Sequence, residues 1–170
     1  IDVVTLFPEF VLGAAQVGVV GRAQERRLLE VAAWNPRDYT NDKHRTVDDR
    51  PFGGGPGMVM LAEPLRQAVR AAQAAGTAPG RVIGLSPQGE RLTQRKVRLL
   101  AEQARLLLVC GRSDGIDERF VAGVGDEVEP VAELDAQQCS GLDTQVVLDR
   151  RDRQHVAGRH RTPREQQTVR

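Results

Sequence analysis

Short apolar runs alternate with amphipathic stretches along the first two thirds of the chain. Ile1–Phe7 is rich in β-branched residues, and Leu28–Trp34, Arg81–Leu85 and Leu106–Val109 are further apolar runs of strand length. The last two are apolar at almost every position, which is typical of strands buried on both faces of a parallel sheet. The runs therefore predict a parallel sheet.

The stretches between these runs have helical periodicity. One begins at Pro8 and extends to about Arg27, and another places apolar residues at helical spacing from Leu61 until Gly76 ends it. Thr93 is placed to cap a third helix. The alternation of strands and helices predicts an α/β fold, in which a parallel sheet is flanked by helices.

The segment Pro36–Gly57 does not fit this alternation. It is polar and aperiodic, and its end overlaps the glycine-rich stretch DDRPFGGGPGMVM, residues 48–60. Glycine permits positive φ and proline fixes φ, so the segment is predicted to be one long, shaped loop. Its glycines lack the spacing of a P-loop or a dinucleotide fingerprint. Composition alone leaves two alternatives, a tight connector or a backbone surface that a flat ligand can approach.

Composition narrows the class of protein without naming a partner. The 170-residue chain is 40% hydrophobic and 28% charged, as in ordinary globular proteins, and its net charge of +1 does not require a polyanionic partner. Two cysteines, Cys110 and Cys139, favour a reduced, cytoplasmic setting. No apolar run has the roughly 20 residues of a membrane span, and no Cys/His cluster has metal-ligand spacing.

Two polar loops follow the buried strands. Leu85–Glu90 and Cys110–Arg119 each come directly after an apolar run. Because the carboxyl ends of parallel strands meet at one edge of a sheet, where ligands bind, we expect these loops to lie side by side. The glycines of Gly53–Gly57 are expected to join them.

Five segments occur in a characteristic order: DVVTLFPEF, VGRAQERRLLEV, WNPRDYTNDKHRTVDDRPFGGGPGMVM, LSPQGERLTQRKV and LVCGRSDGIDERF. Together, over residues 1–120, they resemble the bacterial tRNA (guanine-N(1))-methyltransferases, a family of the SPOUT class of knotted methyltransferases. The resemblance implies a SPOUT-type domain that transfers a methyl group from S-adenosylmethionine to N1 of the guanosine next to the tRNA anticodon. It also implies a cytoplasmic homodimer.

The resemblance also implies which residues form the site. Those expected to bind the cofactor are Leu85, Ser86, Pro87, Gly89 and Gly111. Those expected to meet the tRNA are Asp48, Asp49, Arg50, Gly53, Gly55, Gly57 and Arg112. Guanine N1 carries a proton that a base must remove, and a carboxylate suits that role. Asp114 is the candidate base; it and Ser113 replace the glutamate and the aromatic residue of the family's CGRYEG pattern.

The resemblance ends near residue 128. The family's SIGDYVLSGGE-like knot loop and the aspartate-bearing segment after it have no counterpart in residues 129–170, which become arginine-rich and aperiodic from about Asp149. We therefore interpret residues 1–128 as the methyltransferase domain and residues 129–170 as a divergent, poorly ordered tail of the kind an out-of-frame continuation produces. We expect little methyltransferase activity from this chain alone. The alternatives are an inactive fragment and a nonenzymatic RNA-binding module that uses Asp42–Arg50 and the basic end of the tail.

Overall fold

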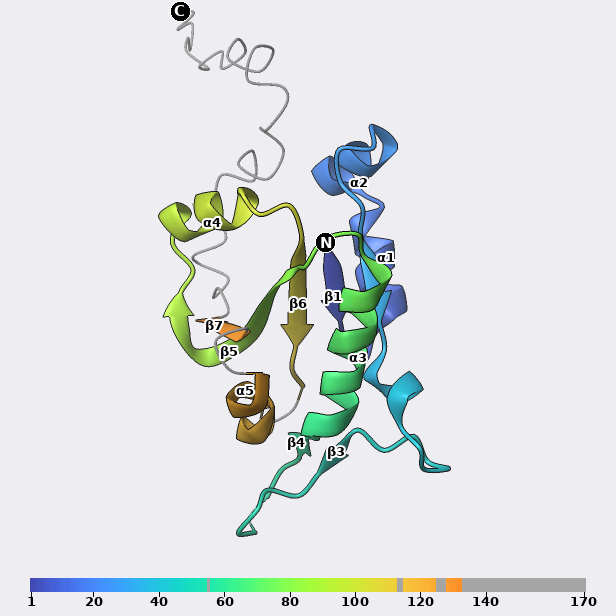
Figure 1. Ribbon diagram of the computed structural model, residues 1–170, viewed down its shortest axis with the longest axis vertical. Helices are drawn as coiled ribbons and strands as arrows, with labels where there is room; N and C mark the ends of the chain where they lie inside the picture. Colours follow the sequence, from blue (N-terminus) through green and yellow to red (C-terminus); the bar gives the residue numbers. More distant parts are fainter. Residues whose placement is uncertain (55, 113–114, 125–127, 133–170) are drawn as a thin grey trace, which may run out of the picture.

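A parallel sheet forms the centre of the computed structural model, which describes residues 1–54, 56–112, 115–124 and 128–132 (Figure 1). The sheet has five strands in the order β2-β1-β6-β5-β7, and each neighbouring pair is parallel. The strands are β1 (Asp2–Val4), β2 (Ala32–Trp34), β5 (Arg81–Arg91), β6 (Leu106–Cys110) and β7 (Val128–Ala132). The predicted fold class is confirmed.

Helices connect these strands much as the periodicity predicts. They are α1 (Pro8–Ala15), α2 (Gly18–Glu25), α3 (Ala62–Ala75), α4 (Gln94–Ala101) and α5 (Glu118–Val124). The stretch from Pro8 to about Arg27 is divided into two helices at Gly18, whose φ of 64° is unfavourable for other residues. Thr93 caps α4 as expected, since its Oγ1 accepts a hydrogen bond of 3.2 Å from the Lys96 backbone N–H. No described helix is long and apolar enough to cross a membrane.

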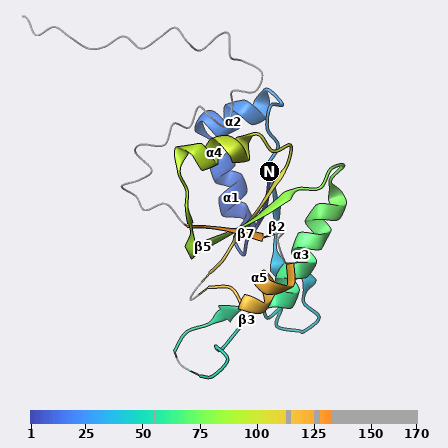
Figure 2. The same ribbon diagram turned by 60° about the vertical axis from the view of Figure 1, so that its left-hand side comes forward.

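The main core lies between one face of the sheet and helix α3. Successive side chains of a strand point to opposite faces, and Val4, Leu107 and Val109 share the face that α3 covers. Buried residues of α3 recur at helical spacing and pack against these strands; they are Leu65, Ala68, Val69 and Ala72. Phe120 brings α5 into the same core, and Figure 2 shows α5 beside α3.

The segment predicted as one loop from Pro36 to Gly57 contains regular structure, which corrects that prediction. A 3₁₀ helix, η1 (Pro36–Tyr39), begins it, and Asn35 caps η1 by accepting a hydrogen bond of 3.0 Å from the Arg37 backbone N–H. Further on, β3 (Asp48–Asp49) pairs with β4 (Val59–Met60) in an antiparallel hairpin. Two-residue strands leave no detectable periodicity in a sequence, so only their pairing reveals them.

The stretch predicted as the loop Leu85–Glu90 belongs to β5, which is a second correction. Leu85 and Glu90 both lie opposite Val131 of β7, so the register shifts and the residues between them form an irregular excursion of the strand. The same pairing places β7 in the sheet, although the sequence assigned residues 129–132 to the tail. The rest of that tail, residues 133–170, lies outside the described residues.

A largely buried ion pair joins the amino-terminal ends of the strands to the end of α3. The carboxylate of Asp2 accepts a hydrogen bond of 2.9 Å from Nε of Arg105 and one of 2.8 Å from the indole N–H of Trp34. The other guanidinium nitrogens of Arg105 donate to the carbonyls of Ala72, Gln73 and Ala78, at 2.5 to 3.3 Å. Arg105 therefore satisfies carbonyl groups that the end of a helix leaves without partners.

We predict that Asp2→Ala lowers the free energy of unfolding by about 3 kcal/mol, because it leaves the guanidinium of Arg105 largely buried without its carboxylate. Urea denaturation measures the change. The matched control is Asp38→Ala, which removes the exposed ion pair to Arg45 and should cost less than about 1 kcal/mol. Equal losses in the two variants would contradict the structural importance of the buried pair.

Candidate functional site

The irregular part of β5 that begins after Leu85 and the segment that follows β6 lie at the same edge of the sheet. Leu85 and Cys110 are direct partners in the parallel pairing of these strands. Ser86 and Gly111, the next residues, therefore begin at adjacent positions, as the sequence predicts. This edge is the one at which open parallel sheets bind ligands.

The β3–β4 hairpin is bonded to the segment after β6 through Met60. Its backbone N–H donates to the Gly115 carbonyl, and its carbonyl accepts from the Asp117 N–H, both at 3.0 Å. These bonds make a parallel bridge between Met60 and Ile116. The base of the hairpin is thus fastened to the segment after β6. The expected contact of Gly53–Gly57 with the two strand-end segments stays a prediction, since the hydrogen bonds run through Met60 instead.

The end of β1 contributes an aromatic side chain to this edge. The guanidinium of Arg112 lies 5.4 Å from the ring centroid of Phe7, within the range of a cation–π interaction. Both side chains are exposed. The sequence placed Arg112 among the tRNA contacts and gave no role to Phe7, since only the parallel pairing of β1 with β6 brings the two together.

The residues expected to bind the cofactor form the wall between β5 and β6. Leu85, Ser86 and Gly89 are partly buried in β5, the backbone of Pro87 belongs to the same strand, and Gly111 is exposed just after β6. A Cβ at Gly111 would lie 3.2 Å from Cγ1 of Ile116, which is tighter than ordinary packing. Glycine therefore keeps this position open. The assignment of these residues to a cofactor stays a prediction.

The residues expected to meet tRNA lie on the hairpin. Asp48 and Asp49 form β3, and Oδ1 of Asp49 accepts a hydrogen bond of 2.7 Å from the Arg50 N–H. Gly53 and Gly57 have φ of 97° and 101°, so the glycine-rich loop uses the conformational freedom that its composition predicted. Two of the predicted site residues, Gly55 and Asp114, lie outside the described residues.

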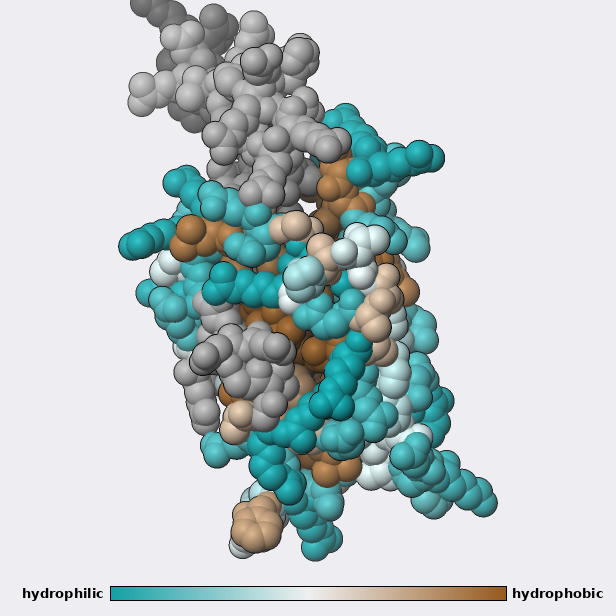
Figure 3. Space-filling model, in the orientation of Figure 1, coloured by the Kyte–Doolittle hydropathy of each residue, from teal (hydrophilic) through white to brown (hydrophobic). Residues whose placement is uncertain are grey.

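A basic loop beside the hairpin is organised by Asp42. Its carboxylate accepts hydrogen bonds from Thr46 Oγ1 at 2.8 Å, from the Thr46 N–H at 2.9 Å and from the His44 N–H at 3.1 Å. The bonds from Thr46 do most to hold the pKa of Asp42 below its usual value. This loop presents Lys43, His44 and Arg45 at the surface. Figure 3 shows that hydrophilic residues dominate this end of the molecule.

The described residues contain no metal site, and the cavity found in the structure lies away from the carboxyl edge. In residues 1–54, 56–112, 115–124 and 128–132, no group of three or more His, Cys, Asp or Glu side chains could hold a metal ion. A cavity of about 890 Å³ lies at the opposite edge, where Asp2, Trp34 and Arg105 are among its lining residues. This cavity is lined by the residues of the structural ion pair described above. The candidate functional site is therefore the carboxyl edge of the sheet.

Comparison with known proteins gives a consistent result. The family model described as "tRNA (Guanine-1)-methyltransferase TrmD" matches residues 1–133. A tRNA (guanine-N(1)-)-methyltransferase of Xanthomonas oryzae pv. oryzae (strain PXO99A) is 56% identical over 143 residues, covering 80% of this chain and 55% of the relative. One of Halorhodospira halophila is 59% identical over 127 residues, covering 75% and 48%. The crystal structure of tRNA (m1G37) methyltransferase from Aquifex aeolicus matches with a TM-score of 0.69 and 30% identity, covering 79% and 59%.

The family match extends beyond the boundaries that we predicted from the sequence. The family match continues past Phe120 to residue 133 and so includes β7. The chain spans about half the length of the curated relatives it matches.

The side chain of Asp117 stabilises the start of α5, next to the segment that follows β6. Its carboxylate accepts hydrogen bonds from the Arg119 N–H at 2.9 Å and from Nε and Nη2 of the same arginine, at 3.0 and 2.5 Å. The side-chain bonds from Arg119 are the main reason that the pKa of Asp117 lies below its usual value. The backbone bond caps the start of α5.

We predict that Asp117→Asn lowers the free energy of unfolding at neutral pH by less than about 1 kcal/mol, because Asn still caps the helix and only the ion pair to the exposed Arg119 is lost, and that this difference disappears in acid. A depressed pKa in the folded state adds stability above the unfolded value of about 4, and that stability is lost as the pH falls through the folded pKa. Denaturation of both proteins from neutral pH down to pH ~3 checks this. A difference that stays constant over that range would contradict the role of the Asp117 charge.

Proposed function

Because the chain belongs to the tRNA (guanine-1)-methyltransferase family, we propose that its carboxyl edge is the catalytic face of an enzyme that methylates tRNA guanine at N1. In this proposal the methyl donor is S-adenosylmethionine and the target is the guanosine next to the anticodon, as the resemblance of the motifs implies. The observation that supports the proposal is the arrangement of the backbone at this edge. β5 and β6 are directly paired there, and Met60 fastens the hairpin to the segment after β6.

The cofactor fits the wall formed by β5 and the segment after β6. Partly buried Leu85 offers apolar contact to an adenine ring, and the absence of a side chain at Gly111 lets a flat group approach the backbone. Leu85, Ser86, Pro87, Gly89 and Gly111 would hold the cofactor, which supplies an electrophilic methyl group.

The chemistry needs a base and a fixed orientation. N1 of guanine becomes a good nucleophile only when its proton is removed, and Asp114 is the carboxylate proposed to accept it. The hairpin residues Asp48, Asp49 and Arg50, with the glycines at 53, 55 and 57, hold the nucleotide. Arg112, which lies over Phe7, is placed to meet a phosphate at the same edge. Holding N1 in line with the methyl group supplies much of the rate.

We further propose that the protein acts in the cytoplasm as a homodimer. The outer surfaces of α1 and α2 support a second copy as the partner, because they expose several large apolar side chains. Phe10 is 77% exposed and Val17 67%, with Leu12, Val19 and Val20 between 37% and 38%. Since the chain spans half the length of its relatives and its end diverges from the family, we expect little activity from the chain by itself.

Calorimetry with S-adenosylmethionine tests the cofactor site directly. Binding at micromolar concentrations, abolished by Gly111→Val, supports the proposal; the control Gly13→Ala places a Cβ where no atom lies within 4 Å and should bind normally. A chain that binds tRNA but no cofactor would instead be a nonenzymatic RNA-binding module. A chain that binds neither would be an inactive fragment of the family.

We predict that Asp49→Ala weakens the binding of tRNA by roughly 10-fold and leaves the affinity for S-adenosylmethionine within a few-fold. The reason is that Asp49 is exposed on the hairpin, whereas the cofactor residues lie on β5 and after β6. Filter binding and calorimetry measure the two affinities. A parallel loss of cofactor binding would refute the assignment of Asp49 to RNA.

A further inference from the structure

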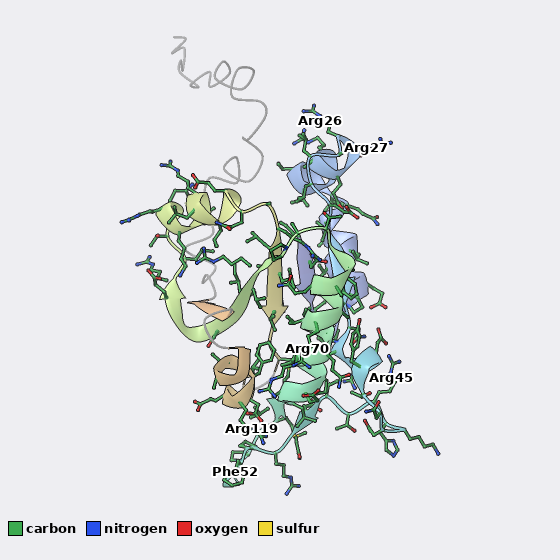
Figure 4. All side chains as sticks on the ribbon, viewed as in Figure 1. Arg26, Arg27, Arg45, Phe52, Arg70 and Arg119 are labelled. Carbon is green, nitrogen blue, oxygen red and sulfur yellow. The ribbon has the colours of Figure 1, made fainter. Side chains whose placement is uncertain are left out.

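Phe52 is the most exposed large apolar residue of the described chain. It is 108% exposed, compared with 77% for Phe10 and 52% for Phe7. Figure 4 shows its ring at the tip of the β3–β4 hairpin, pointing away from the body of the molecule. Single exposed apolar side chains are common on protein surfaces. A partner for Phe52 is indicated by its complete exposure together with the turn that presents it and the cation close to it in the sequence.

The backbone around Phe52 holds the ring in this position. The Gly54 N–H donates a hydrogen bond of 3.0 Å to the Pro51 carbonyl, which closes a tight turn with Phe52 and Gly53 as its central residues. Gly53 has a φ of 97°, as the third position of a type II turn requires. Proline fixes its own φ before the ring, and Gly53 supplies the positive φ that the turn requires. The ring is therefore presented by a shaped turn.

One cation, Arg50, lies near this ring in the sequence, and the hairpin that carries both is connected to the candidate site. Arg50 is exposed two residues before Phe52, and no described carboxylate forms a salt bridge with it. Figure 4 places Arg119, whose guanidinium is paired with Asp117, on the same end of the molecule as the hairpin. The base of the hairpin is bonded through Met60 to the segment after β6. The hairpin thus connects the ring to the candidate site, so an RNA that extends from the site along the hairpin reaches the ring.

The proposed reaction defines the kind of group that can meet this ring. N1 of guanine lies on the edge that forms Watson–Crick pairs, so methylation there requires an unpaired guanosine. The RNA segment around it then contains bases that have lost stacking partners, and such bases stack readily on aromatic side chains.

Resting on the proposed function, we infer that Phe52 is a stacking platform for an unpaired base of the tRNA, next to the target guanosine. The turn at residues 51–54 presents the ring, and Arg50 neutralises a neighbouring phosphate. The ring carries no hydrogen-bonding group, so it orders the RNA segment without reading which base it holds. Phe52 is accordingly a positioning residue for the substrate and takes no part in the methyl transfer.

The test compares the binding of a short hairpin RNA, whose loop contains an unpaired guanosine, by the full 170-residue chain and its variants. We expect Phe52→Ala to weaken binding by about 10-fold. Phe52→Trp should bind at least as tightly as the parent chain, whereas Phe52→Leu, which keeps an apolar group without a ring, should resemble Phe52→Ala. Fluorescence anisotropy of labelled RNA measures all four proteins.

Two controls separate stacking from other effects. Leu99→Ala removes an apolar side chain that is 49% exposed on α4, away from the hairpin, and should leave the affinity unchanged. A fully paired RNA of equal length has no unpaired base, so its weaker binding should be the same for the parent chain and for Phe52→Ala. In addition, 5-iodouridine in the loop should crosslink on irradiation to the peptide that contains Phe52.

The outcomes distinguish this inference from the proposed function. If the parent chain binds the RNA and Phe52→Ala binds it equally well, the stacking role is wrong and the proposed function stands. If Phe52→Leu retains full affinity, the contact is merely apolar and the inference is overturned. If Phe52→Ala changes the oligomeric state in light scattering, the ring contacts a second copy of the chain. No RNA binding by the parent chain would overturn both proposals.

Discussion

The ion pair between Asp2 and Arg105 is the constraint on which the arrangement of the sheet depends. It joins residues 103 positions apart in sequence and fixes the start of β6 beside the start of β1. Two glycines make it possible: a Cβ at Gly76 would overlap the Arg105 guanidinium, and one at Gly80 would overlap Leu107. Arg105 also donates to a carbonyl at the end of α3, and Trp34 of the edge strand β2 donates to Asp2. The same polar cluster therefore holds α3, β1 and β2 together.

The amino-terminal and carboxyl edges of the sheet consequently differ in their polar interactions. At the amino-terminal edge, polar groups are paired with one another; besides the ion pair, the side chain of Gln73 makes two hydrogen bonds with the backbone of Gly80, at 2.6 and 2.8 Å. At the carboxyl edge, short loops with glycine and charged residues leave the strands. A rigid end thus supports an adaptable one, which is the usual relation between a scaffold and the loops that carry function.

The hairpin extends this site outward from the sheet. Its strands have two residues each, too few to be stable alone, and it is held by the bonds between Met60 and the segment after β6. Met60 itself is 1% exposed and packs in the main core. The base of the hairpin is therefore fixed to the core.

The sequence by itself determined the α/β class, the positions of most strands and helices, and the cap at Thr93, because these depend on local periodicity and on single residues. The order of its motifs also identified the family, although the match extends further than the resemblance indicated. Only the tertiary structure decided that β5 continues to Arg91, that β7 joins the sheet, and that Asp48 and Asp49 pair with Val59 and Met60. Each of these depends on hydrogen bonds to residues distant in sequence. Pro130 is unfavourable in strands, and the pairing of β5 with β7 overrides that preference by placing it opposite Gly84; Pro87 and Gly89 fall in the irregular excursion between Leu85 and Glu90.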